Sequence, residues 1–486
     1  MSGAIQHAAS ATAAGGPRPT DSRSIDPHMV DPRPVDPRCN ALTRNLFAFL
    51  HQASGRFAMF GHQNETSNAI GAHTDSDVHA VTGTYPALWG SDLSGVERNE
   101  TTNIDGFSIS DVRNELLRAY GMGAMVTMSW HSVNPITFGG YGHNMAPGSV
   151  AAVLPGGARH EQFLEWLDRV AAFLDSVADG ASGKSVPIIF RPFHEHTGDW
   201  FWWCTGSPAQ PTDTTPEQFI ALWRMTVEYL RDVRGLHNVL YAYSPDRSRI
   251  DMSSAATCEA GYLYAYPGDD YVDVLGFDDY WDIAPAEAKA EQPHERHDDL
   301  ITMLTVVGRL ARERGKLAAA TEVGSPGEFA SRYVMSKADA DALAGPFGSD
   351  AGAGCAGAAG SAGSAGSADS TDAVDSTGSA GLAGAVDSAG SVGAVDSADS
   401  SETDSPDSAV STHWPDSPWT HYLLTAALAN SDTRRVLWYM PWRNDPDAAG
   451  TGAYGTPVAG SRYAADFRRF TEHPFIRMAG TIPPLY

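Results

Sequence analysis

Eight short apolar runs recur along the chain and alternate with segments that have helical periodicity. Most runs end in polar or aromatic residues, a pattern typical of parallel strands that are buried on both faces. Apolar residues recur at helical spacing in 161–178 and 216–233, with polar residues on the opposite face. The second segment opens with Thr215, Pro216 and Glu217, a favourable helix start. The runs are RFAMFGHQN (56–64), YPALWGSDLS (85–94), GAMVTMSWHS (123–132), VPIIFRPFHE (186–195), NVLYAYSPD (238–246), VDVLGFDDYW (272–281), KLAAATEVG (316–324) and RVLWYMPWRN (435–444).

This alternation predicts an α/β fold, a (β/α)8 TIM barrel that forms a single catalytic domain. In such a barrel the strands are parallel, and their carboxyl ends open on the face where active sites are built. Polar residues that end the runs are therefore expected to gather at one mouth of the barrel.

Two segments of biased composition lie outside this pattern. Residues 1–38 are rich in Pro, Ser and Asp, which predicts a disordered leader. Residues 349–410 consist almost entirely of Ala, Gly, Ser and Asp, and 351–410 carry nine acidic residues without Lys or Arg. We expect a disordered acidic insertion at 349–410, tolerated as a surface loop, which interrupts a catalytic domain spanning 39–486.

Composition narrows the possible partners. The 486 residues carry a formal net charge of −26, which disfavours nucleic acid and anionic membrane surfaces, because phosphate binding requires a basic face. A neutral substrate is compatible with this charge. No apolar run reaches the roughly 18 residues of a membrane span. We therefore expect no nucleic-acid or membrane partner, and a monomer.

The N-terminal sequence and the cysteines bear on the cellular compartment. Residues 1–16 lack a basic start followed by a continuous apolar stretch, so they make a poor signal peptide. The four cysteines show no paired spacing and no disulfide framework. The sequence as it stands predicts a cytoplasmic protein; a misassigned start or an unconventional export route would make it secreted.

Two glutamates carry the main chemical hypothesis. Glu195 ends the fourth run beside Arg191 and a cluster of aromatic residues, and Glu322 ends the seventh. Burial among aromatic rings raises a carboxyl pKa, as a general acid requires, whereas an ionised Glu322 could attack an anomeric carbon. Each glutamate alone could instead form a structural ion pair. Strands four and seven of a barrel face each other, and carboxyl groups about 5–5.5 Å apart would support a retaining double displacement.

Other run ends offer residues for binding a sugar. His131, Tyr280 and Trp442 end the third, sixth and eighth runs. Sugar sites combine an aromatic platform with hydrogen-bonding groups, so Trp442 could be the platform. Tyr280 could donate a hydrogen bond to Glu322 and hold it in place.

These motifs resemble glycoside hydrolase family 26, a group dominated by endo-β-1,4-mannanases. RPFHEHTGDWFWW (191–203) resembles the acid/base segment of that family and TEVG (321–324) its nucleophile segment; SWHSVNP, GFDDY and WRN resemble its third, sixth and eighth strand segments. The resemblance implies that Glu195 is the acid/base and Glu322 the nucleophile. It also implies substrate contacts from His131, Arg191, His194, Trp200, Tyr280 and Trp442.

The resemblance implies hydrolysis of β-1,4-mannosidic linkages in mannan, galactomannan, glucomannan or manno-oligosaccharides with retention of configuration. This scheme requires neither a cofactor nor a metal. A β-1,3-xylanase or mixed-linkage β-glucanase of the same family is the main alternative. A metal-dependent hydrolase built on the many histidines, such as His194 and His196, and a catalytically inactive sugar-binding barrel are weaker ones.

Overall fold

The computed structural model describes residues 32–71, 74–180, 183–283, 293–324, 417–444 and 455–482. The predicted insertion at 349–410 and most of the predicted leader lie outside these ranges. The described residues contain the whole of each of the eight predicted strand regions.

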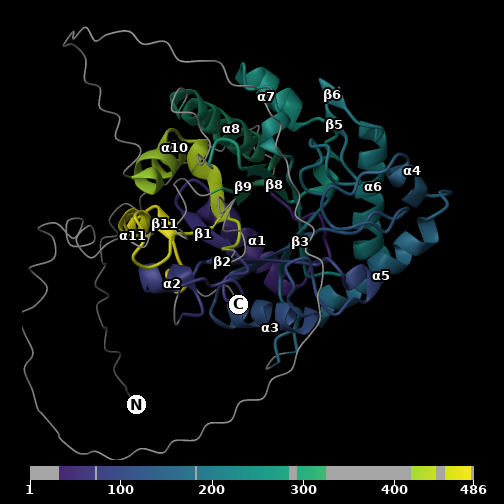
Figure 1. Cartoon of the computed structure of the whole chain (residues 1–486), viewed down its shortest axis with the longest axis horizontal. Coiled ribbons are helices and arrows are strands. Elements are labelled where there is room, and N and C mark those ends of the chain that lie inside the picture. The colour runs from purple at the N-terminus through teal and green to yellow at the C-terminus, as the bar shows by residue number, and fades with distance from the viewer. Residues whose placement is uncertain are drawn as a thin grey trace, which may run out of the picture. The chain divides into compact units, whose positions relative to one another are not determined.

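Eight parallel strands close into a barrel, which confirms the predicted (β/α)8 fold (Figure 1). The ring closes where the last of these strands pairs with the first, with Met59 opposite Trp438 and Phe60 opposite Tyr439. A short additional strand, β11 (Ile476–Arg477), pairs with β1 outside the ring, and Gly206–Ser207 (β5) and Gln210–Pro211 (β6) form a separate small hairpin. In order around the ring, the strands are β1 (Ala58–Gln63), β2 (Leu88–Asp92), β3 (Met125–Trp130), β4 (Ile188–Pro192), β7 (Val239–Tyr243), β8 (Val274–Asp279), β9 (Leu317–Val323) and β10 (Val436–Pro441).

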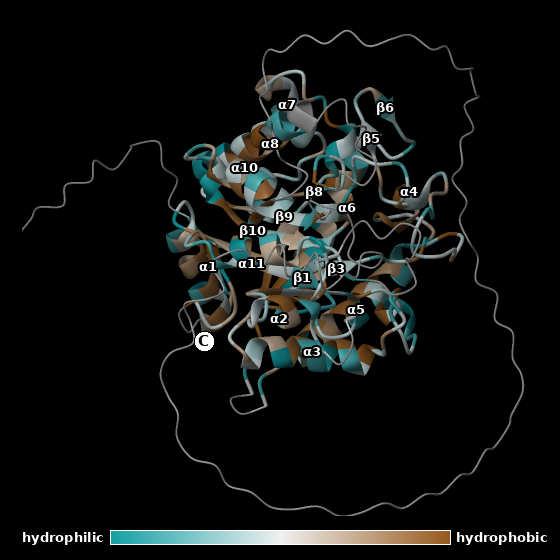
Figure 2. Cartoon of the chain, turned by 60° about the vertical axis from the view of Figure 1, so that its left-hand side comes forward, coloured by the Kyte–Doolittle hydropathy of each residue, from teal (hydrophilic) through white to brown (hydrophobic). Residues whose placement is uncertain are grey.

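Helices surround the strands and carry both hydrophobic and hydrophilic residues, as Figure 2 shows for α3 and α5. Both predicted helices are present; the second begins with a capping box between Thr215 and Gln218 and ends in a π-helical turn, Tyr229–Val233. None of the described helices combines the length and apolar character needed to cross a membrane. The α-helices are α1 (Ala41–Ala53), α2 (Asp77–Thr82), α3 (Ile109–Gly121), α4 (Ser149–Val153), α5 (His160–Ser176), α6 (Pro216–Glu228), α7 (Ala255–Tyr262), α8 (Pro293–Arg314), α10 (Thr425–Leu428, preceded by a π-helical segment, Pro418–Leu424) and α11 (Ala464–Glu472).

Alternating strand residues build two hydrophobic layers. Met59, Met125 and Ile189 belong to an inner cluster, together with residues of α1 such as Leu46 and Leu50. Their strand neighbours belong to a second cluster between the strands and the outer helices. Because successive strand side chains point to opposite faces, strands buried on both sides read as the continuous apolar runs seen in the sequence.

The predicted leader is corrected at its C-terminal end. Val35 and Asp36 are buried, although both fall within the segment expected to be disordered. The backbone N–H of Val35 donates to Asp273 at 2.7 Å, and Asp36 accepts a hydrogen bond from His237 at 2.7 Å. These partners lie more than 200 residues away in sequence, so local composition gave no sign of them.

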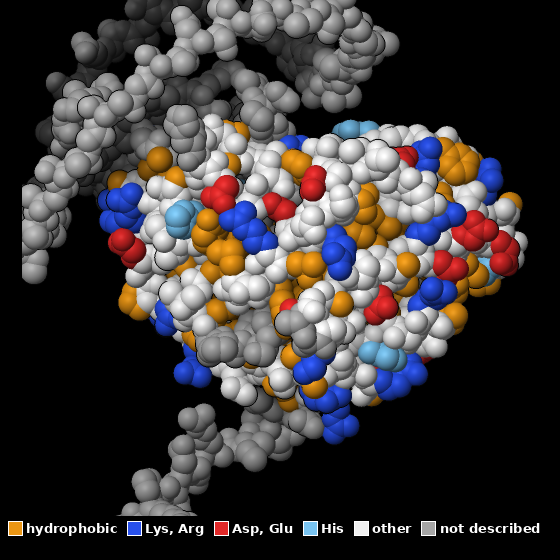
Figure 3. Space-filling model, turned by 90° about the horizontal axis from the view of Figure 1, so that it is seen from below, with side chains coloured by type: hydrophobic (Ala, Val, Ile, Leu, Met, Phe, Trp, Pro, Cys, Tyr) orange, Lys and Arg blue, Asp and Glu red, His pale blue; other side chains and the backbone are white. Residues whose placement is uncertain are grey.

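The described surface mixes both signs of charge. On the face shown in Figure 3, Lys and Arg side chains lie among Asp and Glu side chains rather than in one basic stripe. Ion pairs of opposite charge, such as Arg312 with Asp432 and Arg309 with Glu259, recur among the described helices and loops.

Candidate active site

A pocket of about 390 Å³ opens at the carboxyl ends of the strands. Glu195 and Glu322 both line it, although 127 residues separate them in the chain. One carboxylate oxygen from each, together with one from Asp278, lie within 4.8 Å of one another. The residues that line the pocket are Ile104, Asp105, His131, Glu195, Trp200, Asp246, Tyr280, Glu322, Trp442 and Arg443.

Glu195 lies in a strained turn directly after β4. Phe193 and Glu195 both have positive φ values, 52° and 55°, which cost non-glycine residues of order 1 kcal/mol or more each. Surrounding hydrogen bonds hold this turn: Glu195 N–H donates to the Ser244 carbonyl at 2.7 Å, and Trp203 Nε1 donates to the His194 carbonyl at 2.7 Å. The strained backbone directs the Glu195 side chain into the pocket.

The surroundings of Glu195 favour its protonated form. Burial raises the pKa of the Glu195 carboxyl well above its ordinary value, and the nearby carboxylates of Glu322, Asp246 and Asp278 raise it further. A hydrogen bond from Trp200 Nε1 to Glu195 Oε2, at 2.6 Å, acts in the opposite direction. A carboxyl group kept protonated near neutral pH is suited to act as a general acid.

Two donors hold the Glu322 side chain in place. Arg191 Nη2 donates to Glu322 Oε1, and the Tyr280 hydroxyl donates to Oε2 at 2.8 Å. The predicted bond from Tyr280 is therefore present. The pairing of β8 with β9 skips Thr321, and this register shift places Asp278 opposite Glu322. The Thr321 hydroxyl donates to Asp278 at 2.7 Å. The glutamate is thus fixed by a cation, a phenol and an irregular strand pairing.

The structure shows the partners of Arg191. It is buried and does not line the pocket, and its predicted contact with substrate stays a prediction. Its guanidinium donates to Glu322 and, at 2.7 Å, to Asp278. The alternative pairing of Arg191 with Glu195 is not observed. Burial by itself lowers the pKa of Arg191, but the two carboxylates outweigh it and raise the pKa.

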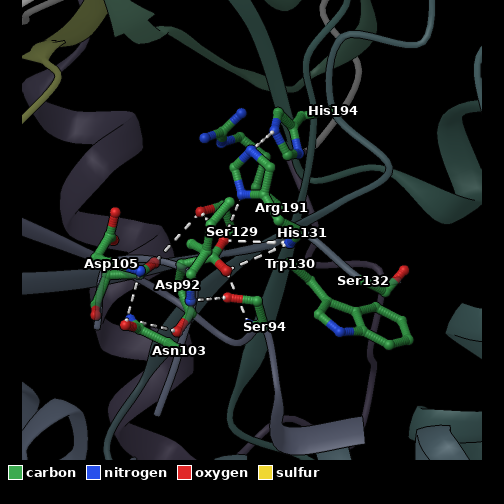
Figure 4. Close-up of polar contacts among 12 residues, drawn as sticks. Asp92, Ser94, Asn103, Asp105, Ser129, Trp130, His131, Ser132, Arg191 and His194 are labelled. Carbon is green, nitrogen blue, oxygen red and sulfur yellow. Dashed lines mark hydrogen bonds and ion pairs between the residues drawn. The ribbon is translucent and has the colours of Figure 1, made fainter. Parts of the chain in front are cut away.

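His131 lines the pocket and is supported from behind by Asp92, as Figure 4 shows. Its Nδ1 lies 2.8 Å from Asp92 Oδ2, and Asp92 also accepts from the Ser129 hydroxyl at 2.7 Å and from Ser94 N–H at 2.8 Å. Asp92 can only accept in this position, so Nδ1 of His131 carries a proton. Burial alone lowers the pKa of His131, but Asp92 holds it above its ordinary value.

His194 lies behind His131 and does not itself line the pocket; its predicted contact with substrate stays a prediction. The two Nε2 atoms are 3.0 Å apart, and the rings meet edge to face with centroids 4.3 Å apart. Burial, followed by the charges of His131 and Arg191, lowers the pKa of His194 well below its ordinary value. The proton between the two Nε2 atoms therefore belongs to His131, and Nε2 of neutral His194 accepts the hydrogen bond.

Three predicted aromatic residues line the pocket: Trp200, Tyr280 and Trp442. Trp442 lies beside His131, with ring centroids 6.1 Å apart, which suits it as a platform for a sugar ring. The site also contains residues that the sequence did not single out. These are the buttress Asp92, the paired Asp278, the pocket residue Asp246, and Asp105 with Arg443, whose side chains form an ion pair at 2.8 Å.

The carboxylates of Glu195, Asp278 and Glu322 are the group that could hold a metal ion among the described residues. Arg191 already neutralises two of them. The histidine alternative loses its geometric basis, because His196 does not face His194. It stacks on Phe219 with ring centroids 4.4 Å apart, and its Nε2 lies 3.0 Å from the Tyr264 carbonyl oxygen.

A (β/α)8 barrel that presents two close glutamates from its fourth and seventh strands has the architecture of a retaining glycoside hydrolase. The chain belongs to glycosyl hydrolase family 26, whose family model matches residues 35–340.

Known relatives and solved structures agree with this assignment. A mannan endo-1,4-beta-mannosidase from Bifidobacterium adolescentis is 34% identical over 293 residues, which cover 59% of this chain and 27% of that protein. One from Bacillus subtilis strain 168 is 29% identical over 241 residues, 48% of this chain and 59% of that protein. The chain thus spans less than two-thirds of either relative. A GH26 beta-mannanase structure from Bacteroides ovatus is similar with a TM-score of 0.64 at 28% identity, covering 92% of this chain and 97% of that one.

Proposed function

We propose that this protein is a retaining glycoside hydrolase that cleaves β-1,4-mannosidic linkages. The observation that carries the proposal is the pair of glutamates, whose carboxylate oxygens lie within 4.8 Å in one pocket but in opposite electrostatic surroundings. Glu322 is paired with a cation, whereas Glu195 is buried beside other carboxylates. Such a pair separates the roles of nucleophile and acid. The named activities of the relatives support mannan as the substrate.

The reaction follows from these two environments. Glu322 attacks the anomeric carbon while the glycosidic C–O bond breaks, and Glu195 gives its proton to the departing oxygen. Glu195, now ionised, then takes a proton from water, which attacks the same carbon and releases Glu322. Two displacements retain the anomeric configuration. Arg191 and Tyr280 keep Glu322 oriented, and Trp442 offers a face for the sugar ring.

The substrate is tested by comparing initial rates on mannan, mannotriose, lichenan and β-1,3-xylan. We expect mannan to be cleaved faster than the glucan and the xylan. A higher rate on lichenan or β-1,3-xylan would assign the chain to a mixed-linkage β-glucanase or a β-1,3-xylanase instead. The products of mannan digestion, resolved over time, distinguish internal cleavage from trimming of chain ends.

The residue roles are tested by Glu195→Ala and Glu322→Ala, with Glu165→Ala on the exposed face of α5 as the matched control. Glu195→Ala should abolish most turnover of mannan but spare aryl glycosides with good leaving groups, because these need no proton. Glu322→Ala should lose activity on both. Equal losses on both substrates for Glu195→Ala would remove its acid role, and substantial residual turnover would remove Glu322 as nucleophile.

A further inference from the structure

A third carboxylate, Asp246, lines the pocket beside the two glutamates. It follows β7 and is fixed on both sides by backbone contacts. Thr197 Oγ1 donates to the Asp246 carbonyl at 2.8 Å, and Asp246 forms a parallel bridge with Asp278. Together with the bond from Glu195 N–H to the Ser244 carbonyl, these contacts hold Asp246 next to the turn that carries Glu195.

The two oxygens of the Asp246 carboxylate are used differently. Oδ1 accepts hydrogen bonds from the backbone N–H of Ser248, at 2.8 Å, and from its hydroxyl. Within the described part of the chain, Oδ2 accepts no hydrogen bond. The residue is 94% buried, with 6% of its surface exposed, and lines the pocket. One oxygen is thus anchored, and the other is available to a ligand.

The neighbouring arginines do not neutralise Asp246. Arg247 donates instead to Asp282 and, at 2.7 Å, to Asp299. Arg249 pairs with Asp199 at 2.8 Å and lies over the Trp200 ring. A carboxylate with a free oxygen in a pocket for a neutral sugar matches the hydroxyl groups of that sugar, which donate hydrogen bonds.

We propose that Asp246 is a substrate-binding residue: its Oδ2 accepts a hydrogen bond from a hydroxyl of the sugar next to Glu195. This assignment rests on the proposed function. The negative charge of Asp246 also bears on Glu195. When Glu195 gives its proton to the departing oxygen, it becomes a carboxylate, and repulsion from the Asp246 carboxylate raises the energy of this ionised form. Asp246 therefore favours reprotonation of Glu195 from water in the second step, which restores the acid.

The charged groups around Glu195 and Asp246 determine how the pH dependence of kcat/KM should respond to a substitution. Burial raises the pKa of Asp246 to about 6, and Asp279 raises it while Arg247 lowers it. Ionisation of Glu195 removes the acid and gives the alkaline limb of the pH profile. The charged and titratable groups near Glu195 are Arg191 from β4, Cys204, Asp246 after β7, Asp278 from β8, Tyr280 and Glu322 from β9. Those near Asp246 are Glu195, Cys204, Arg247, Asp278 and Asp279.

The experiment uses Asp246→Asn, Asp246→Ala and Ser248→Ala in the full chain, with Asp251→Asn as the matched control. Asp251 is exposed and lies on the same loop. Asp246→Asn removes one negative charge near Glu195, so the alkaline limb of kcat/KM on mannan should move down by roughly one pH unit. Asp246→Ala should also lower kcat/KM by about 10- to 100-fold through loss of the charged acceptor. Ser248→Ala removes the hydroxyl that anchors Asp246 Oδ1, so it should raise KM several-fold. Because the charge of Asp246 is kept, the alkaline limb should stay in place.

The outcomes separate the two proposals. If the wild-type chain does not turn over mannan, the proposed function fails. If it does, but kcat/KM of Asp246→Ala equals those of wild type and Asp251→Asn, the substrate contact assigned to Asp246 is overturned. An alkaline limb of Asp246→Asn that coincides with theirs overturns the effect of its charge on Glu195. The position of a limb does not depend on the amount of folded enzyme, so partial unfolding of a variant does not obscure the result. Ser248→Ala distinguishes the binding contact from the charge effect.

Discussion

Glu97 makes the stability of the protein depend on pH near neutrality. Its carboxyl group is buried, and burial raises its pKa from 4.5 to about 7. It accepts a hydrogen bond from Trp130 Nε1 at 3.2 Å and one from the Val133 backbone at 3.2 Å, one on each oxygen. Glu97 therefore braces the loop that carries His131 into the pocket.

The direction in which stability changes with pH follows from the number of protons that the folded and unfolded states bind. In the unfolded chain Glu97 loses its proton near pH 4.5, whereas in the folded protein it keeps the proton until about pH 7. Between these values the folded state binds more protons, so the free energy of unfolding falls as pH rises through this window. A shift from 4.5 to about 7 corresponds to a loss of about 3 kcal/mol by pH 8.

The perturbation is Glu97→Gln, which cannot ionise. Gln has one acceptor oxygen for two donors, so we expect it to be less stable than wild type at pH 4.5 by about 1–3 kcal/mol. Only wild type loses stability when Glu97 ionises, so the difference in free energy of unfolding between wild type and Glu97→Gln should shrink or reverse by pH 8.5. Urea denaturation followed by Trp fluorescence at several pH values measures it, with Glu165→Gln on the exposed face of α5 as control. A wild-type minus Glu97→Gln difference that stays constant with pH would refute the reasoning.

Three further predictions concern the site and its supports. Tyr280→Phe removes the 2.8 Å bond to Glu322 and should lower kcat by about 10- to 100-fold with little change in KM; an unchanged kcat would show that Arg191 suffices to hold the nucleophile. Asp92→Asn should lower the pKa of His131, so that NMR of ¹⁵N-labelled histidine at pH 7 reports neutral His131; a persistent imidazolium signal would contradict the assigned proton. Thr215→Ala breaks the capping box of α6 and should cost about 1 kcal/mol of stability without altering kcat, measured by thermal denaturation and mannan turnover; a lower kcat would mean that α6 influences the site.

The sequence was most informative where the structure depends on local pattern. The eight apolar runs became the eight strands of the ring, because a strand buried on both faces must be apolar at nearly every position. Thr215 and Pro216 marked the start of α6, since capping involves residues within one helical turn. Glu195 and Glu322 stood out because each ends such a run, and strands four and seven of a closed ring bring their ends to one mouth.

The division of roles within the pocket depended on contacts between distant segments. Arg191 looked like a partner for Glu195 or a substrate contact, yet closure of the ring places it against Glu322 and Asp278. The shifted pairing of β8 with β9, which no local periodicity reveals, sets Asp278 opposite Glu322. Val35 and Asp36 appeared to belong to a disordered leader but are buried by partners at 273 and 237. The amino-acid sequence by itself determined the strands, the barrel and the two glutamates, because burial and capping act on neighbouring residues. Only the tertiary structure decided which charges neutralise each other and which face the substrate, because electrostatic interactions depend on distance in space rather than on separation along the chain.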